Sequence, residues 1–273
     1  MINIIIFSKD RACQLGALLE SLNDKMKIDH KVSVIYTFSE SNYKNGYDIL
    51  LQNYPDCNFV KETTFKDDVM ALVDSDCEHV MFLVDDIVFI RNVELDSNFE
   101  AFNNNKDVLT LSLALSPAVT FEYPRQMHVK MPEIKNNTFE WVNRWKKRKN
   151  KKSNEWGAGW DCPMSVGGNI FRTKDFLPYV EKIVFYNPNT MESRMQKRPF
   201  KSKPLMMCCD KAKLIAVPIN IVVENGYRNR HGETDAFTLN NKWLDGMKID
   251  VSVIYGLEFN AIHNIIDWEF IKR

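Results

Sequence analysis

The stretch Met81-Phe82-Leu83-Val84-Asp85-Asp86-Ile87-Val88-Phe89-Ile90 is an apolar run with two adjacent carboxylates in its middle. It predicts a buried strand that ends at Asp85, because a short hydrophobic strand cannot easily bury two negative charges. Open α/β sheets bind ligands beyond the carboxyl ends of their strands, where this pair would emerge. Two carboxylates there favour a divalent cation and, through it, a diphosphate. The alternative is that the pair merely forms a turn.

The chain before this stretch alternates between strand and helix patterns. Apolar runs at residues 2–7, 32–36 and 58–61 predict strands, and helical spacing follows Ala12, Asn42 and Thr64. A strand is expected again at residues 108–113, after the Asp pair. Such alternation predicts βαβ units. We therefore expect an α/β protein with a mainly parallel central sheet flanked by helices.

The composition restricts the class of protein. The 273 residues are 45% hydrophobic and 12% aromatic, which is ample for a large core. Lys plus Arg and Asp plus Glu both number 36, and this zero formal net charge argues against a general nucleic-acid binder. The six cysteines contain no C-x-x-C and favour reduced packing cysteines. With no basic segment or long apolar run at the start, we expect a soluble, cytoplasmic protein.

The expected sheet lacks the usual phosphate-binding glycines. No G-x-G-x-x-G follows the first strand, and the chain has no Walker A lysine. A cation held by the Asp pair would supply the missing positive charge. Polar residues at the ends of the first two strands would then contact a base and ribose, or would simply serve as turn and cap residues. These residues are Ser8, Arg11, Thr37 and Ser39.

A family resemblance rests on two motifs. Phe7-Ser8-Lys9-Asp10-Arg11 with Gln14-Leu15, followed by the stretch around Asp85-Asp86, resembles the GT-A-fold nucleotide-sugar glycosyltransferases. More narrowly, it resembles a bacterial and viral group that opens with an F-S-K-D-R-x-x-Q-L element. The resemblance implies that the pair holds Mn²⁺ or Mg²⁺ against the donor diphosphate. Because Ile87 replaces the usual third acid, it implies an x-D-D pattern, with Asp86 as direct ligand and Asp85 as its partner toward ribose or a metal-bound water.

Residues 164–172 predict a strand that contains Gly168, and a glycine within a strand indicates close approach by another group, here a sugar ring. Asn189 or Thr190 is expected to open a later helix with Glu192 in its first turn. Glu192 could merely complement the helix dipole. The resemblance implies a carboxylate base at such a helix start in inverting enzymes, which makes Glu192 the first candidate. Asp161 is the second candidate, and Asp210 the third.

A late glycine-bearing loop carries Arg228, Arg230 and His231. Arginine binds phosphate through paired charge-assisted hydrogen bonds, and histidine can bind a phosphate or a metal. The resemblance implies a metal-binding histidine from a late loop, which favours His231. The other four histidines are expected to be structural or exposed: His30, His79, His128 and His263.

A basic run at residues 145–152 is expected to be a solvated loop. Its alternative is a contact with an anionic acceptor or with a membrane surface.

These patterns and the resemblance predict one glycosyltransferase domain, with a nucleotide-binding half at residues 1–115 and a smaller acceptor-side and catalytic half at 116–273. It would move a sugar from a UDP- or GDP-sugar donor to a hydroxyl of a glycan acceptor, with metal and with inversion. Nucleotidyl transfer is one alternative. A non-catalytic module that binds sugar nucleotides or glycans is the other.

Overall fold

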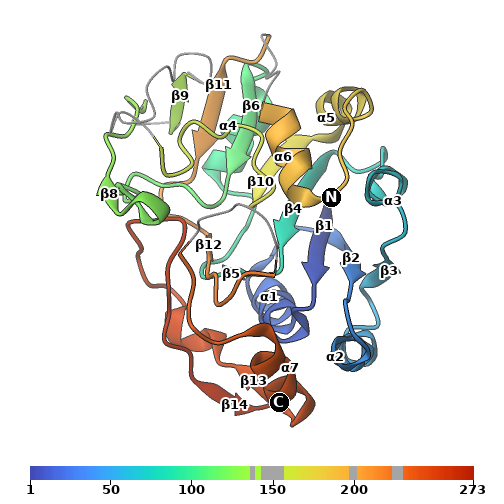
Figure 1. Cartoon of the computed structure of the whole chain (residues 1–273). Coiled ribbons are helices and arrows are strands. Elements are labelled where there is room, and N and C mark those ends of the chain that lie inside the picture. Colours follow the sequence, from blue (N-terminus) through green and yellow to red (C-terminus); the bar gives the residue numbers. More distant parts are fainter. Residues whose placement is uncertain (136–138, 143–156, 197–201, 223–229) are drawn as a thin grey trace.

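The computed structural model describes residues 1–135, 139–142, 157–196, 202–222 and 230–273 (Figure 1). Within these residues a central sheet has eight strands, in the order β3-β2-β1-β4-β10-β6-β11-β9. Four of its seven neighbouring pairs are parallel, and the three that involve β10 or β9 are antiparallel. The expected α/β class, with a mainly parallel central sheet flanked by helices, is confirmed.

The first part of the chain alternates between strand and helix as predicted. Each of β1, β2 and β4 is buried in its middle, which explains their continuous apolar runs. The elements are β1 (Ile2–Lys9), α1 (Ala12–Lys25), β2 (His30–Thr37), α2 (Ser41–Asn53), β3 (Asn58–Lys61), α3 (Phe65–Leu72) and β4 (His79–Val84).

The stretch Met81–Ile90 forms two strands rather than one. β4 ends at Val84, as predicted, and β5 (Ile87–Phe89) belongs to a separate two-stranded sheet with β12 (Leu214–Ala216). Asp85 and Asp86 form the turn between β4 and β5. The two carboxylates therefore lie at the carboxyl edge of the central sheet.

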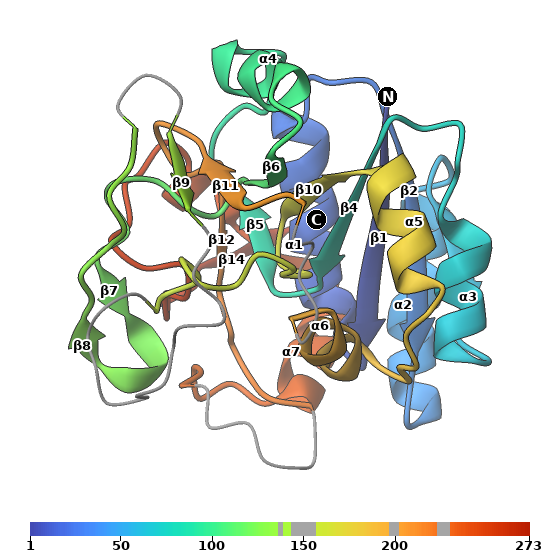
Figure 2. The same ribbon diagram turned by 90° about the horizontal axis from the view of Figure 1, so that it is seen from above.

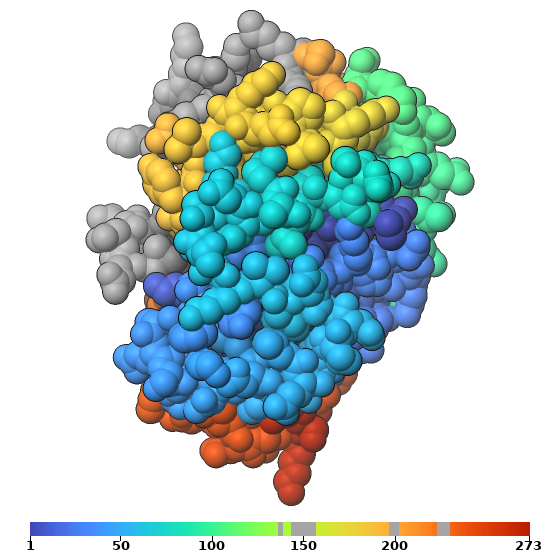
Figure 3. Space-filling model, turned by 90° about the vertical axis from the view of Figure 1, so that its right-hand side faces the viewer, coloured from blue at the N-terminus to red at the C-terminus, as the bar shows by residue number. Residues whose placement is uncertain are grey.

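Two cores cover the two faces of the sheet. Ile4 and Ile6 of β1 pack into a core with α1 and α2, whereas Ile5 and Phe7 pack into a core with α3, α5 (Thr173–Val180) and α6 (Pro188–Gln196). This alternation follows from the two-residue period of a strand. Figure 2 shows α1 on one side of β1 and β4, with α3 and α5 on the other. In Figure 1, α2 and α3 lie on the side of the molecule where β3 is the edge strand, and Figure 3 shows the blue to cyan surface on that side.

The second part of the chain is less regular than predicted. The strand expected at residues 164–172 is limited to β10 (Asn169–Arg172), and turns precede it. The elements are α4 (Ser97–Asn104), β6 (Val108–Ser112), β7 (Phe121–Glu122), the 3₁₀ helix η1 (Tyr123–Arg125), β8 (Met127–His128), β9 (Glu140–Val142), β10, α5, α6, β11 (Leu205–Cys208), β12, α7 (Ala236–Leu244), β13 (Met247–Ile249), the 3₁₀ helix η3 (Val251–Ile254) and β14 (Phe270–Lys272).

The basic run at residues 145–152 lies outside the described residues. Among the helices in the described ranges, none has the length and apolar character needed to cross a membrane.

Candidate functional site

Asp85 and Arg11 form a buried ion pair at the carboxyl edge of the sheet. β1 and β4 are neighbours, so the turns after them meet there. Asp85 is 4% exposed, and its Oδ1 lies 2.9 Å from Nη1 of Arg11. Its Oδ2 accepts a hydrogen bond from the backbone N–H of Lys9 at 3.2 Å. Both carboxylate oxygens of Asp85 therefore have partners within the protein.

Asp86 is the more available of the two carboxylates. Its side chain is 18% exposed, against 5% for Asp85. Its Oδ2 lies 3.5 Å from Nη1 of Arg11, a longer contact than the one to Asp85. Its backbone carbonyl accepts from Val217 N–H at 2.7 Å, which fixes the turn against the chain that follows β12. The carboxylate of Asp86 is therefore held in place while one oxygen remains free of Arg11.

The charges at this edge do not balance. Burial raises the pKa of Asp85, and the Arg11 guanidinium opposes that effect. Burial would lower the pKa of Arg11, but the charges of Asp85 and Asp86 outweigh it, so that the guanidinium pKa is raised. Two carboxylates therefore share one guanidinium at this edge.

Two of the four residues expected to contact a base and ribose are internal supports instead. Ser8 is 7% exposed, and its hydroxyl hydrogen-bonds the hydroxyl of the buried Tyr47 at 2.7 Å. The guanidinium of Arg11 is directed into the protein, because it pairs with the Asp turn and with Asn220. Thr37 is half-buried and Ser39 is exposed, so these two remain accessible.

Asp10 joins the turns after β1 and β2, a role that the sequence analysis did not assign. Its Oδ1 accepts from Ser39 N–H at 2.7 Å, and its own N–H donates to Thr37 O at 3.3 Å. Its φ of +56° lies in the left-handed region, which aspartate tolerates better than most residues. The sequence feature that indicates this role is an aspartate in a polar turn directly after a strand.

Gly168 is required by packing. Its φ is +90°, and a Cβ there would lie 2.6 Å from Cδ2 of Leu214. Its N–H donates to Phe82 O at 3.0 Å, next to β4. The close approach that the sequence indicated is made within the protein by Leu214 of β12.

Glu192 lies in the second turn of α6, because the helix begins at Pro188 and Asn187 caps it through a hydrogen bond from Thr190 N–H. The expected cap at Asn189 or Thr190 is wrong. Oε1 of Glu192 accepts from Ser165 Oγ at 2.9 Å and from Val166 N–H at 3.2 Å. Burial raises its pKa, and these two bonds oppose the rise. Glu192 thus holds the turn that leads through Gly168 to β10, beside β4.

The other two candidate bases lie in turns. Asp161 belongs to the turn after Gly159, and its charge helps to raise the pKa of Arg125, after the hydrogen bond and charge of Glu122. Asp210 is exposed and accepts from Lys211 N–H at 2.8 Å, an ordinary turn contact.

The late loop does not bring His231 to the Asp pair. His231 is exposed, and its Nδ1 lies 2.6 Å from Gly232 O. Arg230 is also exposed, and Arg228 lies outside the described residues. In the described parts of the chain, no three His, Cys, Asp or Glu side chains are grouped to hold a metal ion. The expected ligand set of Asp85, Asp86 and His231 is therefore not assembled.

His263 lies near the Asp pair instead, although the sequence analysis treated it as structural or exposed. Residue 263 pairs with Ala216 of β12, and Ala216 pairs in turn with Ile87, next to Asp86. Burial lowers the pKa of His263, while the charges of Asp86 and Glu122 oppose that change. The carboxylate of Asp86 is thus close enough for its charge to act on this imidazole. No local sequence signal distinguished this histidine.

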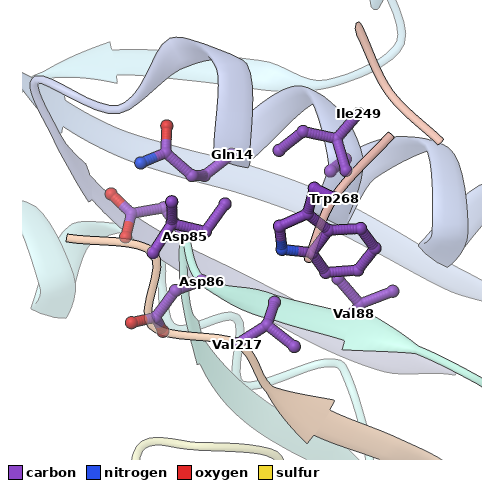
Figure 4. Close-up of a pocket in the computed structure, with 9 residues that line it drawn as sticks. Gln14, Asp85, Asp86, Val88, Val217, Ile249 and Trp268 are labelled. Atoms are coloured by element: carbon purple, nitrogen blue, oxygen red, sulfur yellow. The ribbon is translucent and has the colours of Figure 1, made fainter. Parts of the chain in front are cut away.

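A small cavity is lined in part by Asp85 and Asp86 (Figure 4). The carboxylates of Asp85 and Asp86 lie at one end of it and the indole of Trp268 at the other. Nε1 of Trp268 is buried without a partner among the described residues. The cavity is lined by Gln14, Ala17, Asp85, Asp86, Val88, Val217, Ile219, Ile249 and Trp268.

No protein-family profile matches this chain. Among curated proteins it is similar to the bifunctional glycosyltransferase pgtA of Dictyostelium discoideum, with 27% identity over 296 residues. The match covers 96% of this chain and 38% of that relative, so the chain spans well under half of the relative's length.

Three solved structures are distantly similar. The bifunctional glycosyltransferase WbbM in its apo form has a TM-score of 0.37 at 12% identity, over 72% of this chain and 37% of that one. The galactosyltransferase LgtC, solved with donor and acceptor sugar analogs, has a TM-score of 0.36 at 11% identity, over 75% of this chain and 72% of that one. Mouse xyloside xylosyltransferase 1 in its apo form has a TM-score of 0.33 at 11% identity, over 72% of this chain and 80% of that one. At these TM-scores the fold assignment rests on this chain's own strand order.

Proposed function

We propose that this chain is a glycosyltransferase that moves a sugar from a nucleoside-diphosphate sugar to a hydroxyl of a glycan acceptor. The observation that carries the proposal is the Asp85-Asp86 turn at the carboxyl edge of an α/β sheet, where two carboxylates share the guanidinium of Arg11. The similarity to pgtA along 96% of this chain supports the same class of reaction. A UDP- or GDP-sugar is the proposed donor.

The donor diphosphate explains why a cation is part of the proposal. A diphosphate is itself negative, and at an edge that already has a surplus carboxylate it would be repelled. Asp86, whose side chain is 18% exposed, is the proposed protein ligand of Mn²⁺ or Mg²⁺, and His263 would be a further candidate ligand for Mn²⁺. Mg²⁺ usually takes only one or two protein carboxylates and completes its shell with phosphate and water oxygens. When bound, the cation would stabilise charge on the departing diphosphate.

Other residues of the chain hold and orient the reactants. Arg11 pairs with the buried Asp85, while Asp10 holds the end of β2 and the turn after it, which carry Thr37 and Ser39, the proposed base and ribose contacts. Arg228 and Arg230 are proposed to meet the diphosphate from the late loop. Charge-assisted bonds of arginine suit that ligand.

Glu192 is the proposed general base, which corresponds to inversion. The acceptor oxygen would form a bond to the sugar's anomeric carbon while the bond from that carbon to the diphosphate oxygen breaks, and the hydroxyl proton would pass to Glu192. Oε1 is held by Ser165 and Val166, which leaves Oε2 to take the proton. Burial raises the pKa of Glu192, so it is a stronger base than an exposed glutamate. Asp161 is the alternative base.

A thermal-shift panel of UDP-, GDP-, CMP- and dTDP-sugars, with and without Mn²⁺, tests the donor class. A ligand raises the melting temperature in proportion to the logarithm of its concentration over its Kd. We expect one nucleotide series to stabilise the wild type and to need Mn²⁺ for its full effect. Asp86→Asn should abolish the Mn²⁺-dependent part, whereas the matched change at the exposed Asp48 of α2 should leave it intact. A panel without any shift would refute the proposal.

A further inference from the structure

The turn at residues 164–168, just before β10, is held against α6 at two points. Oε1 of Glu192 accepts from Ser165 Oγ at 2.9 Å and from Val166 N–H at 3.2 Å. Oε1 of Gln196, one helical turn later, accepts from Met164 N–H at 3.3 Å. Residues four apart lie on the same face of a helix, so both side chains reach this turn. The turn therefore fixes the carboxylate of Glu192 as much as Glu192 fixes the turn.

We propose that Ser165 is a positioning residue that holds Oε1 of Glu192 inside the protein, so that Oε2 is the oxygen that accepts the proton of the acceptor hydroxyl. The inference rests on the proposed function, in which Glu192 is the base. Ser165 acts through Glu192 and needs no contact of its own with the reacting atoms.

The hydrogen bonds of Ser165 fix the direction of its hydroxyl proton. The backbone N–H of Gly167 donates to Ser165 Oγ at 3.1 Å. A backbone N–H can only donate, so this contact uses a lone pair of the hydroxyl oxygen. The hydroxyl proton is then left for Oε1 of Glu192, because an ionised carboxylate can only accept. Ser165 thus donates the one side-chain hydrogen bond that Oε1 receives.

The other oxygen of Glu192 is in a different position. Among the residues that the structure describes, no hydrogen bond reaches Oε2, yet this atom is not closed off from solvent. The side chain as a whole is half-buried. Glu192 therefore has one oxygen tied into the protein and one that a hydroxyl group can approach.

The same turn lies between Glu192 and the Asp turn. A Cβ at Gly167 would be 3.4 Å from Ser165 Oγ and 4.0 Å from Cδ1 of Ile87, the residue that follows Asp86. The next residue of the turn donates its N–H to β4 at 3.0 Å. The proposed base is therefore held by a piece of chain that also contacts the carboxyl edge, where the donor is proposed to bind.

Loss of the Ser165 hydroxyl should change both the orientation and the acidity of Glu192. A hydrogen bond to the charged form of a carboxylate lowers its pKa. Burial raises the pKa of Glu192, the bonds from Ser165 and Val166 oppose the rise, and no charged side chain in the described ranges contributes. Without Ser165, only the Val166 N–H would oppose burial, so the pKa should rise further. The carboxylate could also rotate about its single remaining bond.

A titration of Glu192 in the free protein tests the inference without any substrate. Carbon-13 NMR of the full chain, labelled at its glutamate carboxyl carbons, gives the midpoint, and the signal that is missing in Glu192→Gln identifies the residue. We expect Ser165→Ala to move this midpoint to higher pH. Ser165→Thr keeps the hydroxyl and should leave the midpoint near the wild-type value. Ser165→Cys, whose thiol is a weak donor, should also raise it and serves if the alanine variant does not fold.

Gln196→Ala is the matched control. It removes the neighbouring bond to the same turn and leaves both bonds to Glu192 in place, so the midpoint of Glu192 should not move. An unchanged midpoint in Ser165→Ala, or an equal shift in Gln196→Ala, would overturn the inference while leaving the proposed function standing.

Release of UDP or GDP from the corresponding nucleotide sugar connects the titration to catalysis. We expect Ser165→Ala to lower kcat about tenfold or more, with the donor KM within about twofold of the wild-type value, because only the base is misplaced. A raised midpoint with an unchanged kcat would overturn the positioning role alone. A wild type that releases neither nucleotide would instead overturn the proposed function together with the inference.

Discussion

Nη1 of Arg11 lies 2.9 Å from Oδ1 of Asp85, and both side chains are almost completely buried, with 11% and 5% of their surfaces exposed. Arg11 follows the first strand and Asp85 the fourth, so this contact joins the two sequence motifs on which the proposed function depends. The positive charge of Arg11 offsets the cost of burying the Asp85 carboxylate. Four predictions follow from the geometry around this pair.

Replacement of Arg11 by methionine should strongly destabilise the protein. Loss of one partner from a buried ion pair leaves an unpaired charge and typically costs about 3 kcal/mol or more. Urea unfolding measures the change, and a second substitution, Asp85→Asn, should recover part of the loss. Lys248→Met removes a more exposed pair, with Glu20, and should cost less than about 1 kcal/mol. Equal losses in the two single variants would contradict a special role for the Arg11 pair.

Substitution of the two late histidines should separate their roles. The charge of Asp86 acts on His263, whereas His231 is exposed and contacts Gly232. If His263 is a ligand of the proposed cation, His263→Ala should raise the Mn²⁺ concentration needed for half-maximal transfer by about tenfold or more. His231→Ala should leave it close to the wild-type value. The reverse result would restore His231 as the metal-binding histidine.

Glu192 should control the acid limb of the pH profile. Burial raises its pKa above the ordinary 4.5, so the carboxylate becomes protonated, and inactive as a base, at a higher pH than usual. We expect kcat/KM to fall as pH is lowered, with a midpoint above 4.5, and Glu192→Gln to lose that limb and about 10²-fold or more in kcat.

The stability of the protein provides an independent check on the same residue. A carboxyl whose folded-state pKa is raised favours folding below its unfolded pKa, and that contribution is lost as pH rises through the folded value. The unfolding free energy of Glu192→Gln should thus vary less over this range than that of the wild type.

Asp161→Asn should keep a near-normal rate of sugar transfer. A near-normal rate in Glu192→Gln together with a large loss in Asp161→Asn would transfer the role of base to Asp161.

Gly168→Ala should affect stability rather than donor binding. Alanine at a φ of +90° is strained, and its Cβ would lie 2.6 Å from Leu214 Cδ2, so we expect a loss of about 1–3 kcal/mol in unfolding free energy. Gly246→Ala is the matched control, because Gly246 has a φ of +80° and no atom within 4 Å of a Cβ. The difference between the two variants measures the steric part. A stable Gly168→Ala protein with a raised KM for the donor would instead indicate contact with the sugar.

Local patterns were sufficient for the alternation of strands and helices up to the Asp pair. β3 was predicted to the residue, the end of β4 at the first aspartate follows from the cost of burying charge, and Asp96 caps α4 as its sequence position suggests. These features depend on residues a few positions apart. The chain's own sequence therefore determined the class of fold and the position of the Asp pair at the carboxyl edge of the sheet.

Contacts between distant segments decided which side chains meet there. Arg11 turned inward because Asn220, more than 200 positions later in the chain, accepts two of its donors. The segment that carries His263 pairs with β12, which follows the Asp turn in space. Gly168 lacks a side chain and so leaves room for Leu214. A residue type indicates what a side chain can bind, but only the packing of the strands determines which partner is within reach and which oxygen remains free.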